Sequence, residues 1–213
     1  MKKLTIDGDI SRWNESIMEF KKEMKTVGQE EDLVIEINSY GGDAFLGTQL
    51  GNLIAGHPGK TTAIVTGMAA SAATLPVFAC DEIKMYPSSQ IMIHNPATLA
   101  YGDSSHLRKQ ADNLDVTKEA VVEVYANKLD AEKAIKFMDE ETYLNAKMAE
   151  KEGIVDEIIK GKVKPVKSEI FVEQAMSFNK INIVEESDED KQDQELITQM
   201  QQELLLEEIR QTL

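Results

Sequence analysis

The sequence predicts an α/β fold in which short strands alternate with helices around a parallel sheet. Four segments rich in β-branched and apolar residues end in turn residues, as strands do: 34–38, 62–67, 82–87 and 90–95. Helical patterns lie between several of them, and such strand–helix–strand units form parallel pairs with right-handed crossovers. Of the 213 residues, 42% are apolar, which suits a globular core.

Three helices accompany these strands. Residues 45–56, FLGTQLGNLIAG, carry apolar side chains every three or four positions, and residues 71–80, SAATLPVFAC, form an apolar helix. A long helix is expected from about 104 to 129, with Asp103 or Ser104 as its N-cap. Its length predicts that it projects from the sheet.

Charge and cysteine content exclude several functions. The formal net charge of -15 argues against binding to nucleic acid, which needs a basic surface, and against binding to an anionic membrane. The single cysteine, Cys80, excludes an intrachain disulfide and is expected in the buried part of a helix. We see no long apolar run and no cleavable signal before the first strand, so a cytoplasmic protein is expected.

The acidity is concentrated at the C-terminal end. From Glu173 onward there are eleven acidic and three basic residues, a net charge of -8. We therefore expect one domain over residues 1–165 and an acidic extension over 166–213. Apolar residues within the extension recur at helical spacing and predict an amphipathic helix, which docks either on a partner or on its own domain: Leu196, Ile197, Met200, Leu204, Leu205 and Ile209.

The stretch GMAASAA, residues 67–73, sets one serine among very small residues between a strand and a helix. Small residues there allow close packing of backbones, but they also suit a nucleophile at the carboxyl end of a strand. A catalytic Ser71 needs a histidine base. His57 in a turn and His106 on the long helix are expected to be solvated, whereas His94 ends a neighbouring strand, so Ser71 and His94 can meet at one sheet edge.

Four motifs together resemble the proteolytic subunit of the caseinolytic Clp protease and its phage relatives. They are INSYGG (37–42), GMAASAA, QIMIHNP (90–96) and YLNAKMAEKEGIVDEI (143–158), in the order and near the spacing of that family, over roughly residues 3–160. The resemblance implies the crotonase-like ββα superhelix fold with a projecting handle helix. It also implies a serine endopeptidase that assembles into rings enclosing the active sites.

The same resemblance assigns roles to single residues. It implies Ser71 as the nucleophile, His94 as the general base, and the amides of Gly42 and Ala72 as the oxyanion hole. The third member of the triad is expected shortly before Tyr143, where the chain reads KFMDEETYLNA. We choose Asp139, with Glu140 and Glu141 as alternatives. No cofactor and no metal are expected, because no metal-ligand spacing such as HExxH occurs.

The resemblance also implies partners. Polypeptides are the expected substrates, and a homo-oligomeric ring, single or stacked through the long helix, is the expected assembly. The first strand, LTIDG at residues 4–8, begins where the cellular subunit has axial loops for a AAA+ unfoldase, and the acidic extension is absent from that subunit. Both differences resemble phage head maturation proteases, which act on capsid or scaffold proteins in the host cytoplasm.

Three hypotheses therefore stand. The first is the serine endopeptidase, either in phage head maturation or as a cellular subunit that works with an unfoldase. The second is an assembly protein with a vestigial catalytic centre. The third is an acyl-CoA-processing relative with the same fold. The Ser71–His94 pair and the handle favour the endopeptidase.

Overall fold

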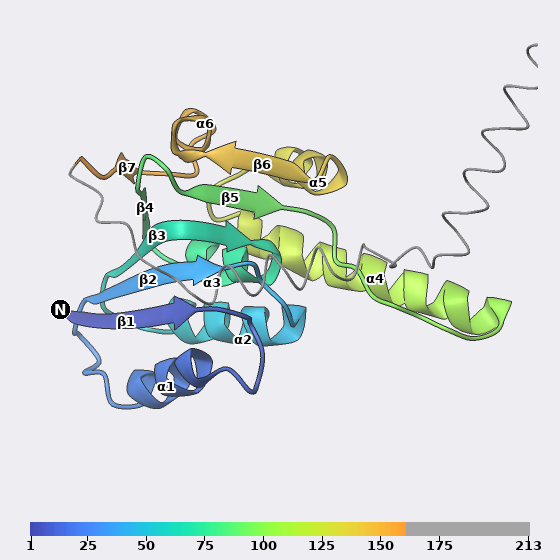
Figure 1. The fold of residues 1–213 in the computed structure, drawn as a ribbon, viewed down its shortest axis with the longest axis horizontal. Helices are drawn as coiled ribbons and strands as arrows, with labels where there is room; N and C mark the ends of the chain where they lie inside the picture. The colour runs from blue at the N-terminus through green and yellow to red at the C-terminus, as the bar shows by residue number, and fades with distance from the viewer. Residues whose placement is uncertain (161–213) are drawn as a thin grey trace, which may run out of the picture. The chain divides into compact units, whose positions relative to one another are not determined.

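A computed structural model describes residues 1–160 of the chain. The described part alternates strands and helices along most of its length (Figure 1). Its elements are β1 (Lys2–Asp7), α1 (Glu15–Met24), β2 (Leu33–Ser39), α2 (Ala44–Ala55), β3 (Thr61–Ala70), the 3₁₀ turn η1 (Ser71–Ala73), α3 (Thr74–Phe78), β4 (Glu82–Met85), β5 (Gln90–Ile93), α4 (Ser104–Tyr125), α5 (Ala131–Asp139), β6 (Thr142–Asn145), α6 (Ala146–Lys151) and β7 (Glu157–Ile158).

One sheet joins these strands in the order β1-β2-β3-β4-β7, and β5 pairs with β3 and β6. The pairs are parallel except for β5 with β6. Strand β3 is long enough to pair twice: its first half pairs with β4 from Thr62 to Val65, and its end pairs with β5 from Met68 to Ala70. The carboxyl ends of β3 and β5 therefore lie side by side.

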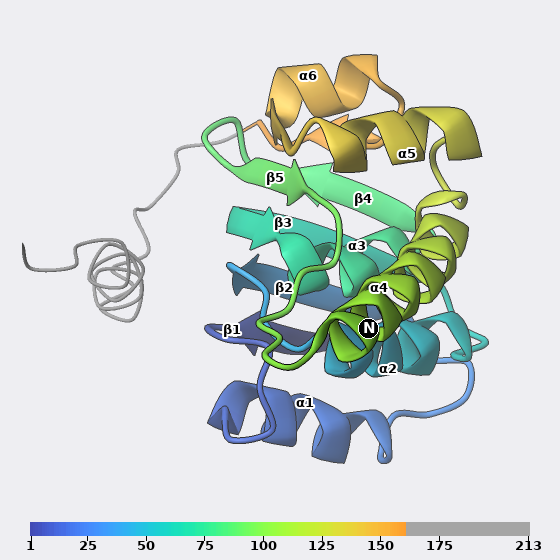
Figure 2. The same ribbon diagram turned by 90° about the vertical axis from the view of Figure 1, so that its right-hand side faces the viewer.

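Helices α2 and α3 cover one face of the sheet, and α1 lies beside β1 (Figure 2). The helix starts follow from the sequence, because a side chain caps each of the longer helices. Asp43 accepts hydrogen bonds from two amides at the start of α2, and Asp103 does so at the start of α4. The strands supply fully buried aliphatic side chains to the core: Leu4, Ile6, Leu33, Ile35, Ile37, Val65, Ile83 and Ile91.

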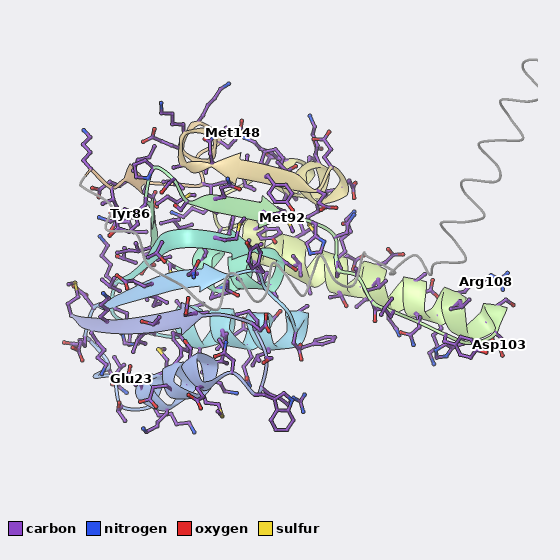
Figure 3. All side chains as sticks on the ribbon, in the orientation of Figure 1. Glu23, Tyr86, Met92, Asp103, Arg108 and Met148 are labelled. Carbon is purple, nitrogen blue, oxygen red and sulfur yellow. The ribbon has the colours of Figure 1, made fainter. Side chains whose placement is uncertain are left out.

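Helix α4 extends beyond the sheet, as its length predicted. Asp103 and Arg108 lie at the end of α4 that is far from the sheet, whereas its last residues pack into the core (Figure 3). Several apolar side chains of α4 and of the segment that leads into it are exposed: Leu107 and Val116 on the helix, and Leu99 and Tyr101 before it. No helix within residues 1–160 is both long and apolar enough to span a bilayer.

Most predicted elements are confirmed, with one correction. The helix predicted over residues 71–80 is a 3₁₀ turn followed by a short α-helix, Thr74–Phe78, because Ser71 has a left-handed backbone. Cys80 is buried as expected, but it lies past the end of that helix. The predicted extension over 166–213 and its amphipathic helix lie outside the described residues.

Helix α2 approaches the turn η1 unusually closely at Gly47. A methyl group added to Gly47 would lie 2.5 Å from the carbonyl oxygen of Ala72 and 3.1 Å from its Cβ. A backbone atom cannot move aside as a flexible side chain can. Gly47 therefore allows α2 to pack against the turn that holds Ser71.

Substitution Gly47→Ala tests this contact. Overpacking of this kind costs about 1–3 kcal/mol, and alanine regains up to about 1 kcal/mol of helix propensity, so we expect a net loss of about 1–2 kcal/mol in the free energy of unfolding. Gly28→Ala is the control, because its added methyl lies at an ordinary 3.7 Å from Glu31 Cβ. Equal stability of both variants in urea denaturation would show that the contact at Gly47 is not tight.

Candidate active site

Ser71 is the first residue after β3 and has a left-handed backbone, with a φ of 55°. Within residues 1–160, Glu141 is the other non-glycine residue with a positive φ, at 47°. A side chain in this region costs conformational energy, and such strain is concentrated at functional sites. The turn therefore presents the hydroxyl of Ser71 at the carboxyl end of β3.

His94 is the first residue after β5 and faces Ser71. The distance from His94 Nε2 to Ser71 Oγ is 2.6 Å, which is a short hydrogen bond. The register of β3 and β5 explains this contact, because Ala70 pairs with Met92, Ser71 is the next residue after Ala70, and His94 is the second residue after Met92. The predicted meeting of the two side chains at one sheet edge is confirmed.

The environment of His94 favours the neutral imidazole. Burial lowers the pKa of His94 below its ordinary value of 6.5, and the charge of Glu141 acts in the opposite direction and raises it. Neutral His94 can accept the proton of Ser71 at Nε2 when Nδ1 carries the other proton. The pair is therefore in the protonation state that a general base requires.

The other two histidines lie elsewhere. His106 is exposed on α4, as expected. His57 is in its predicted turn but is half-buried rather than fully solvated, because its Nε2 lies 2.7 Å from the carbonyl oxygen of Glu31. That turn borders a hollow of about 750 Å³ between α1 and the end of α2, whose lining does not include Ser71.

The three consecutive acids at positions 139–141 have different neighbours. Asp139 accepts hydrogen bonds from Lys118 and from Asn95, and both interactions lower the pKa of Asp139, Lys118 the more strongly. Glu140 lies 3.9 Å from the ammonium group of Lys136.

Glu141 is the acid whose charge acts on the pKa of His94. In the antiparallel pair of β5 and β6, Ile93 lies opposite Thr142, so His94 and Glu141 are the first residues beyond the last pair. This relation depends on the register of β6, which the sequence does not reveal.

The predicted oxyanion residues have different surroundings. Ala72 follows Ser71 within the turn η1, and a methyl group on Gly41 would lie 2.8 Å from Ser71 Cβ and 2.9 Å from the nitrogen of Ala72, so Gly41 is in contact with the turn. Gly42 is the next residue, and a methyl group on it would lie 2.5 Å from the carbonyl oxygen of Ile10. Ile10 donates to Gly41 O and accepts from the amide of Asp43.

A small cavity of about 30 Å³ adjoins the Ser71–His94 pair. It holds a group about the size of one or two water molecules. Its lining is mostly apolar and combines α2, the turn, α3 and the end of α4: Ala44, Ser71, Ala72, Leu75, His94, Pro96, Val121 and Tyr125. Within residues 1–160, no three His, Cys, Asp or Glu side chains gather in a way that would hold a metal ion.

The protein therefore has an α/β fold. A serine and a histidine are hydrogen-bonded to each other at the carboxyl ends of two adjacent parallel strands. The family model described as Clp protease matches residues 11–162. The chain belongs to the Clp protease family, and the expected fold is confirmed.

Two relatives illustrate the similarity. The ATP-dependent Clp protease proteolytic subunit of Ligilactobacillus salivarius is 30% identical over 139 residues, which cover 63% of this chain and 71% of that protein. The protein of the same name from Bacteroides thetaiotaomicron is 29% identical over 140 residues, which cover 64% of each chain.

The pKa of His94 tests which acid lies near the imidazole, and its measurement needs no assay of activity. NMR titration should give a pKa below 6.5, and Glu141→Gln should lower it further, because a negative charge that favours the imidazolium is lost. Asp139→Asn should change it less. A pKa that falls in Asp139→Asn and stays constant in Glu141→Gln would show that Asp139 is the acid that faces His94.

Proposed function

We propose that this protein is a serine endopeptidase in which Ser71 is the nucleophile and His94 the general base. The observation that carries the proposal is the 2.6 Å contact between Ser71 Oγ and His94 Nε2, in a chain of the Clp protease family. The left-handed backbone of Ser71 and the lowered pKa of His94 support it. These features are typical of an activated serine.

The geometry supports an acyl-transfer mechanism. His94 Nε2 accepts the proton as Ser71 Oγ attacks the carbonyl carbon of a peptide bond. The amides of Gly42 and Ala72 are proposed to donate hydrogen bonds to the oxygen that becomes negative. The imidazolium then gives its proton to the leaving amine, and water hydrolyses the acyl-enzyme by the same steps.

The third member of the triad comes from the segment 139–141. Asp139 remains the prediction from the sequence, and its contacts with Lys118 and Asn95 suit a structural tie between α5, α4 and the segment after His94. The charge of Glu141 acts on His94, and both residues lie just beyond the last pair of β5 and β6, which favours Glu141 instead as the group that fixes the imidazole tautomer. A glutamate can serve because this task needs only a carboxylate.

The substrates are proposed to be polypeptides, and the active form a homo-oligomeric ring. The exposed apolar side chains of α4 and of the segment that leads into it support contacts between copies, because such contacts would remove them from water. Sedimentation velocity of the full chain tests the assembly, and a species with the mass of one chain at micromolar concentration would contradict it.

The biological role that we propose is cleavage of capsid or scaffold proteins in phage head maturation, in the host cytoplasm. It rests on the acidic sequence of residues 166–213, which resembles that branch of the family. A cellular subunit working with an unfoldase and a vestigial assembly protein are the alternatives.

Coexpression with capsid and scaffold proteins tests the proposed role. We expect the wild-type protein to cleave them and Ser71→Ala to leave them intact. Capsid and scaffold proteins that stay intact with both variants would contradict the role.

Hydrolysis of an unstructured reporter polypeptide tests the nucleophile and the base. Ser71→Ala and His94→Ala should each lower kcat by at least about 10³-fold, because the serine and its base act as a unit. Their melting temperatures should stay close to that of wild type, since neither side chain belongs to the apolar core. Undiminished cleavage by purified Ser71→Ala would disprove the serine mechanism.

The choice of carboxylate is tested with three amide variants. Glu141→Gln should lower kcat by about 10²- to 10⁴-fold with little change in KM, because the amide no longer stabilises the imidazolium. Glu140→Gln is the matched control and should stay within about twofold of wild type. If Asp139→Asn loses more activity than Glu141→Gln, the prediction from the sequence is right and the assignment from the register is wrong.

A further inference from the structure

Two buried hydroxyl groups connect the end of α4 with the turn that holds Ser71. Thr74 Oγ1 lies 2.6 Å from the carbonyl oxygen of Ser71 and 2.7 Å from the hydroxyl oxygen of Tyr125, which is 51 residues further along the chain. Thr74 is 0% exposed and Tyr125 is 1% exposed. The ring of Phe78 packs edge-on against Tyr125 at 4.8 Å between centroids.

The direction of both hydrogen bonds follows from the number of protons. A carbonyl oxygen can only accept, so the single hydroxyl proton of Thr74 goes to Ser71 O. Tyr125 must then donate its own proton to Thr74 Oγ1. Burial raises the pKa of Tyr125 to about 12, so the phenol keeps that proton at neutral pH. The chain of donors therefore runs from Tyr125 through Thr74 to Ser71.

The carbonyl at the end of this chain belongs to the peptide group that carries the amide of Ala72. A peptide group is planar and trans, so its oxygen and its N–H point in opposite directions and rotate together. A hydrogen bond that fixes Ser71 O therefore fixes the direction of the Ala72 N–H. A strained residue such as Ser71 needs this kind of support to keep its conformation.

We propose that Thr74 and Tyr125 are positioning residues that aim the amide of Ala72 at the oxyanion of the transition state. The proposal rests on the proposed function, since it assumes that this amide is an oxyanion donor. Neither hydroxyl touches the reacting atoms. Both act through the orientation of one peptide group, and the ring of Tyr125 also lines the small cavity beside Ser71 and His94.

Kinetics of single and double variants test the proposal. Thr74→Val should lower kcat by about 10- to 100-fold and Tyr125→Phe by about 10-fold, both with KM nearly unchanged, because oxyanion contacts form only in the transition state. Thr74→Ser keeps the hydroxyl and should retain activity within about threefold. Thr117→Val is the matched control, because it removes a threonine hydroxyl that donates to the carbonyl of Asn113 within α4.

The double variant separates a chain of donors from two independent effects. Once Thr74 has lost its hydroxyl, Tyr125 has no route to Ser71, so Thr74→Val/Tyr125→Phe should be no slower than Thr74→Val alone. Multiplied losses in the double variant would contradict the chain. Melting temperatures are recorded for every variant, and lower stability with an unchanged kcat would show that the two hydroxyls are merely structural.

One further readout does not depend on catalysis. The amide resonance of Ala72 should shift in Thr74→Val and in Tyr125→Phe, and it should not shift in Thr117→Val. If wild type cleaves nothing, the proposed function fails, whereas an Ala72 resonance that shifts as expected still supports the orientation by the two hydroxyls. A resonance that stays constant in both variants refutes that orientation whether or not the enzyme is active.

Discussion

The parallel pairing of β3 with β5 is the constraint on which the site depends. It brings two strand ends together, so that Ser71, one residue after the last pair, and His94, two residues after it, form a short hydrogen bond. The opposite edge of β5 pairs with β6 up to Ile93 and Thr142, the residues next to His94 and Glu141. One short strand thus holds the end of β3 on one side and the start of β6 on the other, and a shift of register on either side would move Ser71 or Glu141 relative to His94.

The turn after β3 depends on close packing around it. Gly47 lets α2 approach Ala72, and Gly41 lies against Ser71 on the other side. Thr74 and Tyr125 hold the carbonyl of Ser71 from within the core. Because Lys118 and Tyr125 both belong to α4, this helix contacts the site at two places, through Asp139 and through Thr74. The projecting part of α4 therefore belongs to a helix that is tied to the site.

The sequence predicts the strands, the long helix and the Ser71–His94 pair because these depend on local patterns. Ser71 and His94 each lie near the end of a predicted strand, and parallel strands place their carboxyl ends at one edge of the sheet. It does not predict the neighbours of the acids, because Asp139, Glu140 and Glu141 are alike in sequence and only the pairing of β6 with β5 separates them. Thr74 and Tyr125 resemble ordinary core residues, and their 51-residue separation hides the contact. The helix expected over residues 71–80 was predicted to start too early, because helical periodicity does not reveal that Ser71 has a left-handed backbone.

The most direct test of the central claim, an activated Ser71, is intact-mass analysis after reaction with a fluorophosphonate. The reagent forms a stable adduct with serines that a neighbouring base activates, so wild type should gain one adduct per chain, on the peptide that contains Ser71. Ser71→Ala should gain none, and the mass of the assembly recorded on the same sample shows which species reacts. An assembled wild-type protein that stays unlabelled, or an adduct that persists in Ser71→Ala, would contradict the account.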